Sequence, residues 1–163
     1  MHHIVTALLA FGFQHFWAYQ VVNSAKAHGL EPAMVAGVIL SEHAGVLRES
    51  STTVANSKSK CVGLGQIAPW WIKNKRFNEL GTWAVTDLRI PIHNIEATAR
   101  VLRIAREDHL RAHGTKSTHH WLAHYKCGWK GLDNCKTPTR NALRYVNRVR
   151  RIIEGLQIIL AMR

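Results

Sequence analysis

Helix boundaries are the strongest constraint in this sequence, because proline and glycine mark them at intervals along the chain. Gly29 would end a first helix that runs to about His28, and a second helix would begin near Glu31. Proline is tolerated in the first turn of a helix and not in its interior, so three further helix starts are expected. They lie at Pro69, Pro91 and Pro138. Because the segments between lack strand-like alternation of apolar and polar residues, the sequence predicts an all-α fold.

The length of the chain favours one main domain. A chain of 163 residues can bury about two-thirds of its unfolded surface in a single core. Residues 1–19 are mostly apolar, but Gln14 and His15 interrupt them, so the segment is shorter than a membrane span. It also lacks the basic start and the small-residue cleavage site of a signal peptide. We expect an N-terminal helical extension over 1–19 and the main domain over 20–163, with an export or membrane-contact segment as the alternative for the extension.

Positive charge dominates the polar residues. The 22 lysines and arginines outnumber the 10 aspartates and glutamates, which leaves a formal net charge of +12. Such a surface attracts polyanions, among them nucleic acid, anionic lipid headgroups and the carboxylate-bearing peptides of the bacterial cell wall. The last segment, from Pro138 to Arg163, mixes arginines with apolar residues at helical spacing. This pattern favours a core-packed helix with a solvated cationic face over a membrane-active helix.

Helical spacing places Glu42 on the apolar face of the second helix. Val35, Val38 and Ile39 lie seven, four and three residues before it, on the same side. Burial disfavours the charged form of a carboxylic acid, and a neutral acid can donate a proton near pH 7. Glu42 is therefore the candidate catalytic residue. The alternative is a glutamate that ends the helix and reaches solvent or pairs with a cation.

Five short motifs follow this helix in the order found in a known family. They are Ala55–Asn56–Ser57, Gly63–Leu64–Gly65–Gln66–Ile67, Asn94–Ile95, Ala123–His124–Tyr125 and Tyr145–Val146. The set resembles the transglycosylase domain of soluble lytic transglycosylases, within the lysozyme-like superfamily, and is similar to its compact bacteriophage versions. The resemblance spans about residues 20–150. It departs from the family at His43, which replaces a serine, at Gly65, which replaces a methionine, and at Lys126–Cys127, which replace asparagine and alanine.

The resemblance implies a lysozyme-like helical domain with an active-site cleft and a peptidoglycan lytic transglycosylase activity. Glu42 would protonate the glycosidic oxygen between N-acetylmuramic acid and N-acetylglucosamine, then accept the proton of the muramoyl C6 hydroxyl, leaving a 1,6-anhydro end. Hydrolysis, as in a lysozyme, ordinarily needs two carboxyls. Six of the other acids, among them Glu96 and Asp108, are expected in polar or surface segments. A peptidoglycan hydrolase stays open, because three acids could be the second carboxyl: Glu49, Asp87 and Asp133.

The same resemblance implies a set of substrate-binding residues, namely Ser57, Gln66, Trp70, Tyr125 and Tyr145. Tyr125 is the best candidate to orient Glu42, since a phenol can donate to a carboxylate while its ring stays buried. A plain core aromatic is the alternative for Tyr125. Trp70 and Trp71 are adjacent, and neighbouring residues on a helix point apart, so only one of them is expected to stack on a sugar.

No cofactor is implied, and no metal site is expected. His109 and His113 have the i, i+4 spacing of metal ligands, but Leu110 stands where a catalytic zinc helix has glutamate. Solvated helix faces are the favoured interpretation of these histidines. The three cysteines, Cys61, Cys127 and Cys135, are too few for a disulfide framework, and a bridge between the last two stays open.

The expected partner is the glycan strand of peptidoglycan, in the bacterial periplasm or cell wall, reached from a virion or after release from a phage-infected cell. Contacts with an anionic membrane or with virion proteins stay open, and nucleic acid is disfavoured. The main alternative to an enzyme is a cationic helical virion protein that binds polyanions without catalysis. A membrane-disrupting protein is the third alternative. The charge of +12 suits all three, whereas a protein that only binds polyanions does not account for a glutamate on an apolar helix face.

Overall fold

The structure, a computed structural model, describes residues 2–45, 47, 61–114, 121–123, 125 and 140–161. Its helices are α1 (His2–Ala10), α2 (His15–Ala27), α3 (Pro32–Glu42), α4 (Pro91–His113) and α6 (Arg140–Ala161), with the short 3-10 helices η2 (Pro69–Lys73) and η3 (Val85–Arg89). The described ranges contain no strand, and only an isolated antiparallel bridge joins Val62 to Ile67. The predicted all-α class is confirmed for this part of the chain.

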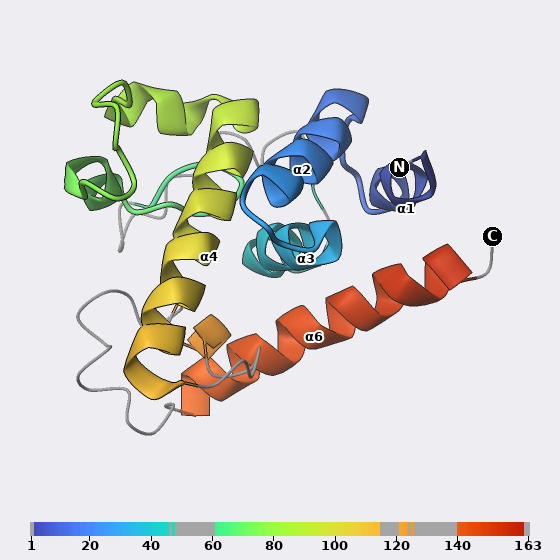
Figure 1. Cartoon of the computed structure of the whole chain (residues 1–163). Coiled ribbons are helices and arrows are strands. Elements are labelled where there is room, and N and C mark those ends of the chain that lie inside the picture. The colour runs from blue at the N-terminus through green and yellow to red at the C-terminus, as the bar shows by residue number, and fades with distance from the viewer. Residues whose placement is uncertain are drawn as a thin grey trace.

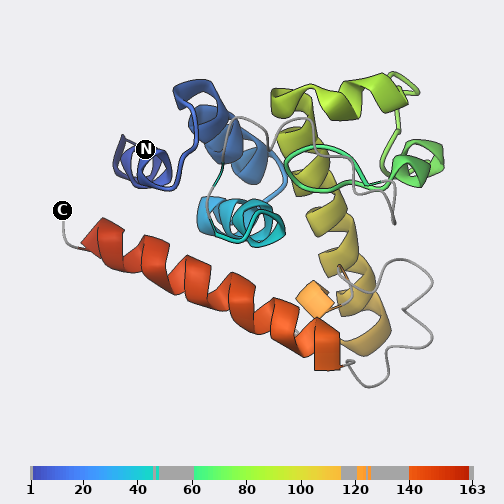
Figure 2. The ribbon, with the colours of Figure 1, turned by 180° about the vertical axis from the view of Figure 1, so that it is seen from behind.

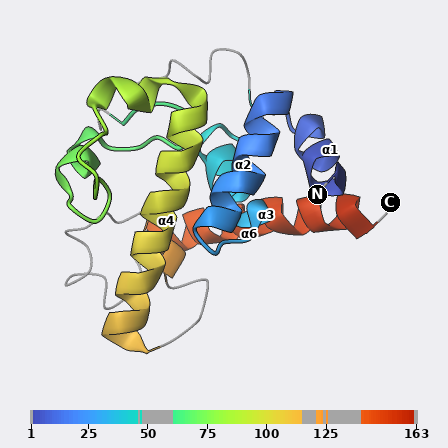
Figure 3. The same cartoon turned by 45° about the horizontal axis from the view of Figure 1, so that its top comes forward.

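Helix α3 lies at the centre of the arrangement. It packs against α2, α4 and α6, and α6 runs along one side of the molecule beneath it (Figure 1). Seen from behind, α4 stands at a steep angle to α6, and η2 and η3 lie at the far end of α4 from α6 (Figure 2). The C-terminal end of α6 lies beside α1, so the two termini are on the same side of the molecule (Figure 3).

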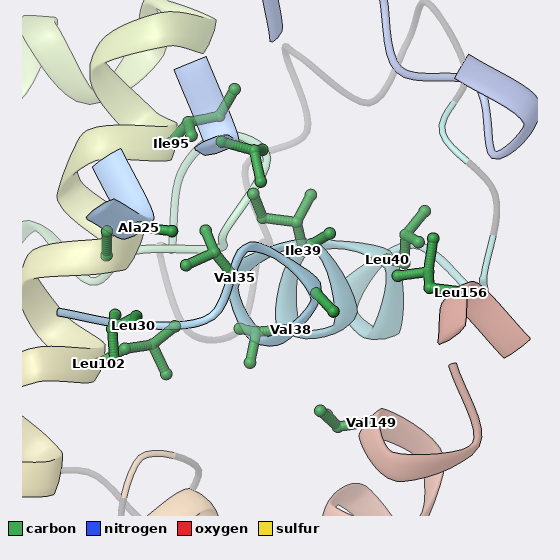
Figure 4. Close-up of a cluster of buried hydrophobic side chains, with 14 of the residues drawn as sticks. Ala25, Leu30, Val35, Val38, Ile39, Leu40, Ile95, Leu102, Val149 and Leu156 are labelled. Atoms are coloured by element: carbon green, nitrogen blue, oxygen red, sulfur yellow. The ribbon is translucent and has the colours of Figure 1, made fainter. Parts of the chain in front are cut away.

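The core forms around α3 because this helix is apolar on every side. Residues 33 and 35–41 are all buried. Leu40 lies beside Leu156 of α6, and Leu30, just before α3, lies beside Leu102 of α4 (Figure 4). Burying one such leucine contributes roughly 1.5–3 kcal/mol. Gly37 lets α6 approach closely, since a Cβ there would lie 2.9 Å from Ile153 Cγ1. A helix with no polar face is thus held inside the fold rather than on its surface.

The N-terminal segment is two helices, and the prediction of one helix up to His28 is wrong in this respect. The chain turns between α1 and α2 at Gly12, whose φ of +85° suits glycine and few other residues. A Cβ at Gly12 would also lie 2.5 Å from the Leu47 carbonyl oxygen. The expected domain boundary after residue 19 falls inside α2, and Leu8 of α1 and Val21 of α2 enter the same core. No helix within the described residues is long and apolar enough to span a bilayer.

The proline positions predict the later helices unevenly. Pro91 is the first residue of α4, as predicted. Pro69 also starts a helix, but η2 is a 3-10 helix of only 5 residues. Pro138 lies outside the described residues, which resume with α6 at Arg140. The apolar side of α6 packs on α3, so the core-packed interpretation of the last helix is confirmed for the described residues.

A partly buried ion pair joins the end of α2 to α4. His28 Nε2 lies 2.7 Å from Glu96 Oε1, and Arg100 Nε lies 3.1 Å from the same oxygen. Burial raises the pKa of Glu96, but hydrogen bonds from His28, Ser24 and Arg100 and the charge of His28 outweigh it and lower that pKa to about 2. Glu96 is therefore not a plain surface acid. Neither is Asp108, which is buried and paired with Arg76, contrary to expectation.

The Glu96 ion pair predicts a loss of stability in acid. The folded pKa of about 2 lies below the ordinary 4.5, so the stabilisation is complete above pH 4.5 and is lost as pH falls toward 2. We expect the free energy of unfolding, measured by urea denaturation, to fall by up to about 3 kcal/mol across this range from this group. In Glu96→Gln this part of the pH dependence should disappear.

Glu154→Gln is the matched control, because Glu154 forms an exposed i, i+4 pair with Arg150. Such pairs contribute little to stability, so its pH dependence should match that of the unsubstituted chain. An unchanged acid profile in Glu96→Gln would contradict the assignment.

Candidate active site around Glu42

Glu42 is the last residue of α3, and its side chain is half-buried at the edge of the core. The helix ends here because Ala44 and Gly45 adopt positive φ angles of 57° and 93°, and the Gly45 amide donates back to the Leu40 carbonyl at 2.8 Å. His43 Nε2 lies 2.8 Å from the carbonyl oxygen of Leu64. This contact ties the end of α3, and with it Glu42, to the turn over residues 62–67.

Asn94 holds that turn in place from α4. Its Oδ1 accepts from the Gly65 amide at 2.7 Å, and its Nδ2 donates to the carbonyls of Val62 at 2.9 Å and Leu88 at 2.7 Å. The side chain is fully buried, so each of these bonds replaces one with water. Gly63 makes room for the amide, since any Cβ at that position would overlap it. The Gly63–Ile67 and Asn94–Ile95 motifs are thus brought into direct contact.

Gly65 has a second reason to be glycine. A Cβ at this position would overlap the hydroxyl of Thr98, which itself donates to the Asn94 carbonyl at 2.8 Å. The space that a side chain at residue 65 would need is therefore filled from α4. This gives a physical reason for glycine at residue 65 of this chain.

Two tyrosines stack beside Glu42. The rings of Tyr125 and Tyr145 have centroids 6.3 Å apart and planes 21° apart. The Tyr125 hydroxyl donates to the Gly65 carbonyl at 3.2 Å, which ties the pair to the same turn as His43 does. Tyr145 projects from α6 and is 2% exposed. Glu42, the turn and the tyrosine pair therefore form one cluster, built from α3, α6 and the residues between them in sequence.

Electrostatics keep both phenols protonated. Burial raises the pKa of Tyr125 well above its ordinary value, and the charges of Glu42 and Cys61 add to this effect. Burial also raises the pKa of Tyr145, as do Tyr125 and the charge of Glu42, while Ser41 acts in the opposite direction. A neutral phenol is a hydrogen-bond donor. The cluster can thus donate to a carboxylate and stabilise its ionised form.

The predicted site residues fare differently. Tyr125 and Tyr145 both lie close enough to Glu42 for its charge to raise their pKa values, and the Tyr125 hydroxyl donates to the Gly65 carbonyl. Tyr145 is too deeply buried to touch a sugar directly. Gln66 is half-buried with a φ of 50°, and its Nε2 donates to the Gly63 carbonyl at 2.9 Å, within its own turn. Ser57 lies outside the described residues.

The two tryptophans of η2 differ in exposure, as expected. Trp70 is 43% exposed and Trp71 is buried. Their rings do not point apart, however, but stack at 4.4 Å with planes 22° apart. The indoles stack although η2 is a 3-10 helix, which with three residues per turn sets adjacent residues about 120° apart around its axis. Trp70 thus offers an exposed indole supported from below by a buried one.

The remaining described acids are engaged elsewhere. Asp87 Oδ2 accepts from the Ala84 amide at 2.7 Å and so caps η3. Glu31 precedes α3, at the opposite end of the helix from Glu42. The others have cationic partners within 4 Å: Glu79, Glu96, Glu107, Asp108 and Glu154. Glu49 and Asp133, the other candidates for a second carboxyl, lie outside the described residues.

Histidine and cysteine add no metal centre to the described part of the chain. Groups of three or more possible metal ligands do not occur within it. His109 is buried rather than on a solvated face, which corrects the expectation, and the side chain of His113 lies outside the described residues. Cys127 and Cys135 also lie outside them.

Sequence reasoning missed three residues that support the cluster. Ser41 acts on Tyr145, His43 joins α3 to the turn, and Thr98 fills the space beside Gly65. Only His43 carried a signal, as a departure from the family pattern beside the catalytic candidate. The contacts of Ser41 and Thr98 depend on how α3, α4 and α6 pack together.

The overlap between residues 65 and 98 predicts a coupled pair. Gly65→Ala should lower the free energy of unfolding by about 1–3 kcal/mol, because the new methyl group meets the Thr98 hydroxyl. Adding Thr98→Ala should remove part of that penalty. The measurement is a double-mutant cycle by urea denaturation. Strictly additive effects of the two substitutions would contradict this packing.

Neither the known protein families nor the curated proteins give a match to this chain.

Proposed function

We propose that this protein is a peptidoglycan lytic transglycosylase with Glu42 as its single acid and base. The observation that carries the proposal is a half-buried carboxylate at a helix end, beside two stacked tyrosines whose phenols are held neutral. A carboxyl in this setting has neutral phenols close by that favour its ionised form and partial shielding from water that favours its neutral form. It is suited to alternate between the two.

The reaction needs two proton transfers and no water. Glu42, as the acid, donates its proton to the glycosidic oxygen as the bond between that oxygen and the muramoyl C1 breaks. The C6 hydroxyl oxygen of the same sugar then bonds to C1, and the Glu42 carboxylate accepts its proton. The products are a free hydroxyl on the leaving sugar and a 1,6-anhydro ring, and Glu42 ends in its starting form.

The distribution of acids supports one carboxyl over two. A hydrolase places its two carboxyls about 5–10 Å apart across the bond. Each described acid other than Glu42 caps a helix, pairs with a cation, or, as Glu31 does, lies at the far end of α3, about 16 Å away along its axis. Within the described residues this distribution supports transglycosylation over hydrolysis, and Glu49 and Asp133 lie outside them.

The proposal extends to the surroundings of Glu42. It includes a lysozyme-like arrangement with a cleft that opens at Glu42, in which the turn over residues 62–67 forms one wall. The half-buried Gln66 and the exposed Trp70, which lie in the same stretch of the chain, would contact the glycan. Tyr145 acts through Glu42, as a positioning residue. The substrate places the activity in the periplasm or wall of bacteria.

Glu42→Gln tests the proposal directly. Glutamine keeps the shape of the side chain but cannot transfer the proton, so clearing of a purified peptidoglycan suspension should slow by on the order of 100-fold or more. Glu31→Gln is the matched control, because it changes the same residue type at the exposed opposite end of α3. Full activity in Glu42→Gln, with circular dichroism unchanged, would refute the assignment. Mass spectrometry of the released fragments should find 1,6-anhydro ends, and reducing ends would indicate a hydrolase instead.

A pair of tyrosine variants tests the positioning role. Tyr145→Phe removes the buried hydroxyl whose pKa Glu42 raises and keeps the ring, so kcat should fall about tenfold with little change in KM, as expected for the loss of one polar group that interacts with a charged side chain. Tyr125→Phe removes a donor to the Gly65 carbonyl and should cost less. The pH profile of Tyr145→Phe should also move, which a merely structural role would not cause. Equal kcat losses in the two variants would contradict the distinction.

A further inference from the structure

Four arginines form a row along the outer side of α6. Their spacing of four, four and three residues places them on one side of the helix. All four are exposed, and we call them the arginine row: Arg140, Arg144, Arg148 and Arg151. The row extends over about 16 Å, at 1.5 Å per residue. Successive guanidinium groups thus repeat roughly once per turn of the helix.

The row carries uncompensated positive charge within the described part of the chain. The acid on α6 is Glu154, and its partner at 3.6 Å is Arg150, which does not belong to the row. Arg148 lies over the ring of Tyr145, with its guanidinium carbon 5.8 Å from the ring centroid. A set of like charges held this close together costs electrostatic free energy, which an anionic partner relieves.

The core orients the row outward. The opposite side of α6 is buried through Ala142, Tyr145, Val146, Val149 and Leu156. Helix α6 lies along one side of the molecule, with α3 on its inner side (Figures 1 and 2). The helix therefore cannot insert its apolar side into a bilayer without losing its packing on α3, and a partner meets the cationic side.

Apolar side chains accompany the charges. Leu143, beside Arg144, is 48% exposed, and Ile158, seven residues beyond Arg151 and on the same side, is 60% exposed. Exposed leucine and isoleucine next to arginines are typical of surfaces that enter the headgroup region of a membrane. They gain nothing from a nucleic acid backbone, which is contacted by hydrogen bonds and charges.

We propose that the arginine row docks this protein on an anionic lipid surface, with α6 parallel to the bilayer and still packed on α3. The guanidinium groups contact lipid phosphates, and Leu143 and Ile158 enter the headgroup region. The proposal is independent of catalysis at Glu42, and Glu42→Gln should bind vesicles as the unsubstituted chain does.

The test compares two variants that lose the same charge. The row variant carries Arg140→Gln, Arg144→Gln and Arg151→Gln, and leaves Arg148 in place because it contacts Tyr145. The matched control carries Lys26→Gln, Lys73→Gln and Lys75→Gln, three exposed lysines outside α6. Binding is measured by sedimentation with vesicles of phosphatidylcholine containing about a third phosphatidylglycerol, and with vesicles of phosphatidylcholine alone.

The unsubstituted chain should bind the anionic vesicles and not the neutral ones. The row variant should lose roughly 100-fold in partition coefficient, since each cation near such a surface contributes about a factor of five. The lysine variant should retain most of the binding. Equal losses in the two variants, or no binding of anionic vesicles by the unsubstituted chain, would overturn the proposal.

A parallel titration with duplex DNA separates the two classes of polyanion. If the row variant loses affinity for DNA but keeps its affinity for vesicles, the row is a nucleic acid surface and the proposal is overturned. Should the triple substitution lower the melting temperature, Arg140→Gln with Arg151→Gln gives the same comparison with a smaller loss.

Discussion

The buried amide of Asn94 is the interaction on which the site around Glu42 depends. It makes hydrogen bonds to three backbone groups, and these fix the turn over residues 62–67 against α4. The Leu64 and Gly65 carbonyls of that turn then form hydrogen bonds with the side chains of His43 and Tyr125, respectively. Without the Asn94 amide, the buried Gly65 N–H would lose this partner, at a cost of about 1–3 kcal/mol, and the Val62 carbonyl would keep the Ile67 amide as its donor. The position of Glu42 relative to the two tyrosines thus depends on Asn94, whose side-chain hydrogen bonds go to the Gly65 amide and to the carbonyls of Val62 and Leu88.

The second constraint is the close contact of α3 with α6. Gly37 has no side chain to keep Ile153 away, so the two helices approach closely along their buried sides. This brings Tyr145 of α6 to the end of α3, where Glu42 raises the pKa of its hydroxyl and Ser41 lowers it. The stacked Tyr125 completes the cluster from the other side. Helix packing, rather than any local motif, therefore assembles the group that could carry the chemistry.

The sequence predicts the helical class, the starts of α3 and α4, and the position of Glu42 at the core edge, because helix periodicity and proline are local signals. It does not predict the turn at Gly12, because ten apolar residues around it look continuous. It names Tyr125 as the residue that orients Glu42, whereas the packing of α6 also brings the buried Tyr145 close to that carboxylate. The burial of Asp108 and the filling of the Gly65 position by Thr98 likewise depend on contacts between segments distant in sequence.

Helix α6 contributes both to the cluster around Glu42 and to the outer surface, since Tyr145 lies on its buried side and the arginine row on its exposed side. A rigid helix has a fixed diameter of about 10 Å with its side chains. A lipid surface that covers the arginines would therefore lie at a fixed distance from the tyrosine pair, because the helix separates the two. Under the two proposals above, the helix would act as a spacer that sets the height above a lipid surface at which glycan reaches Glu42.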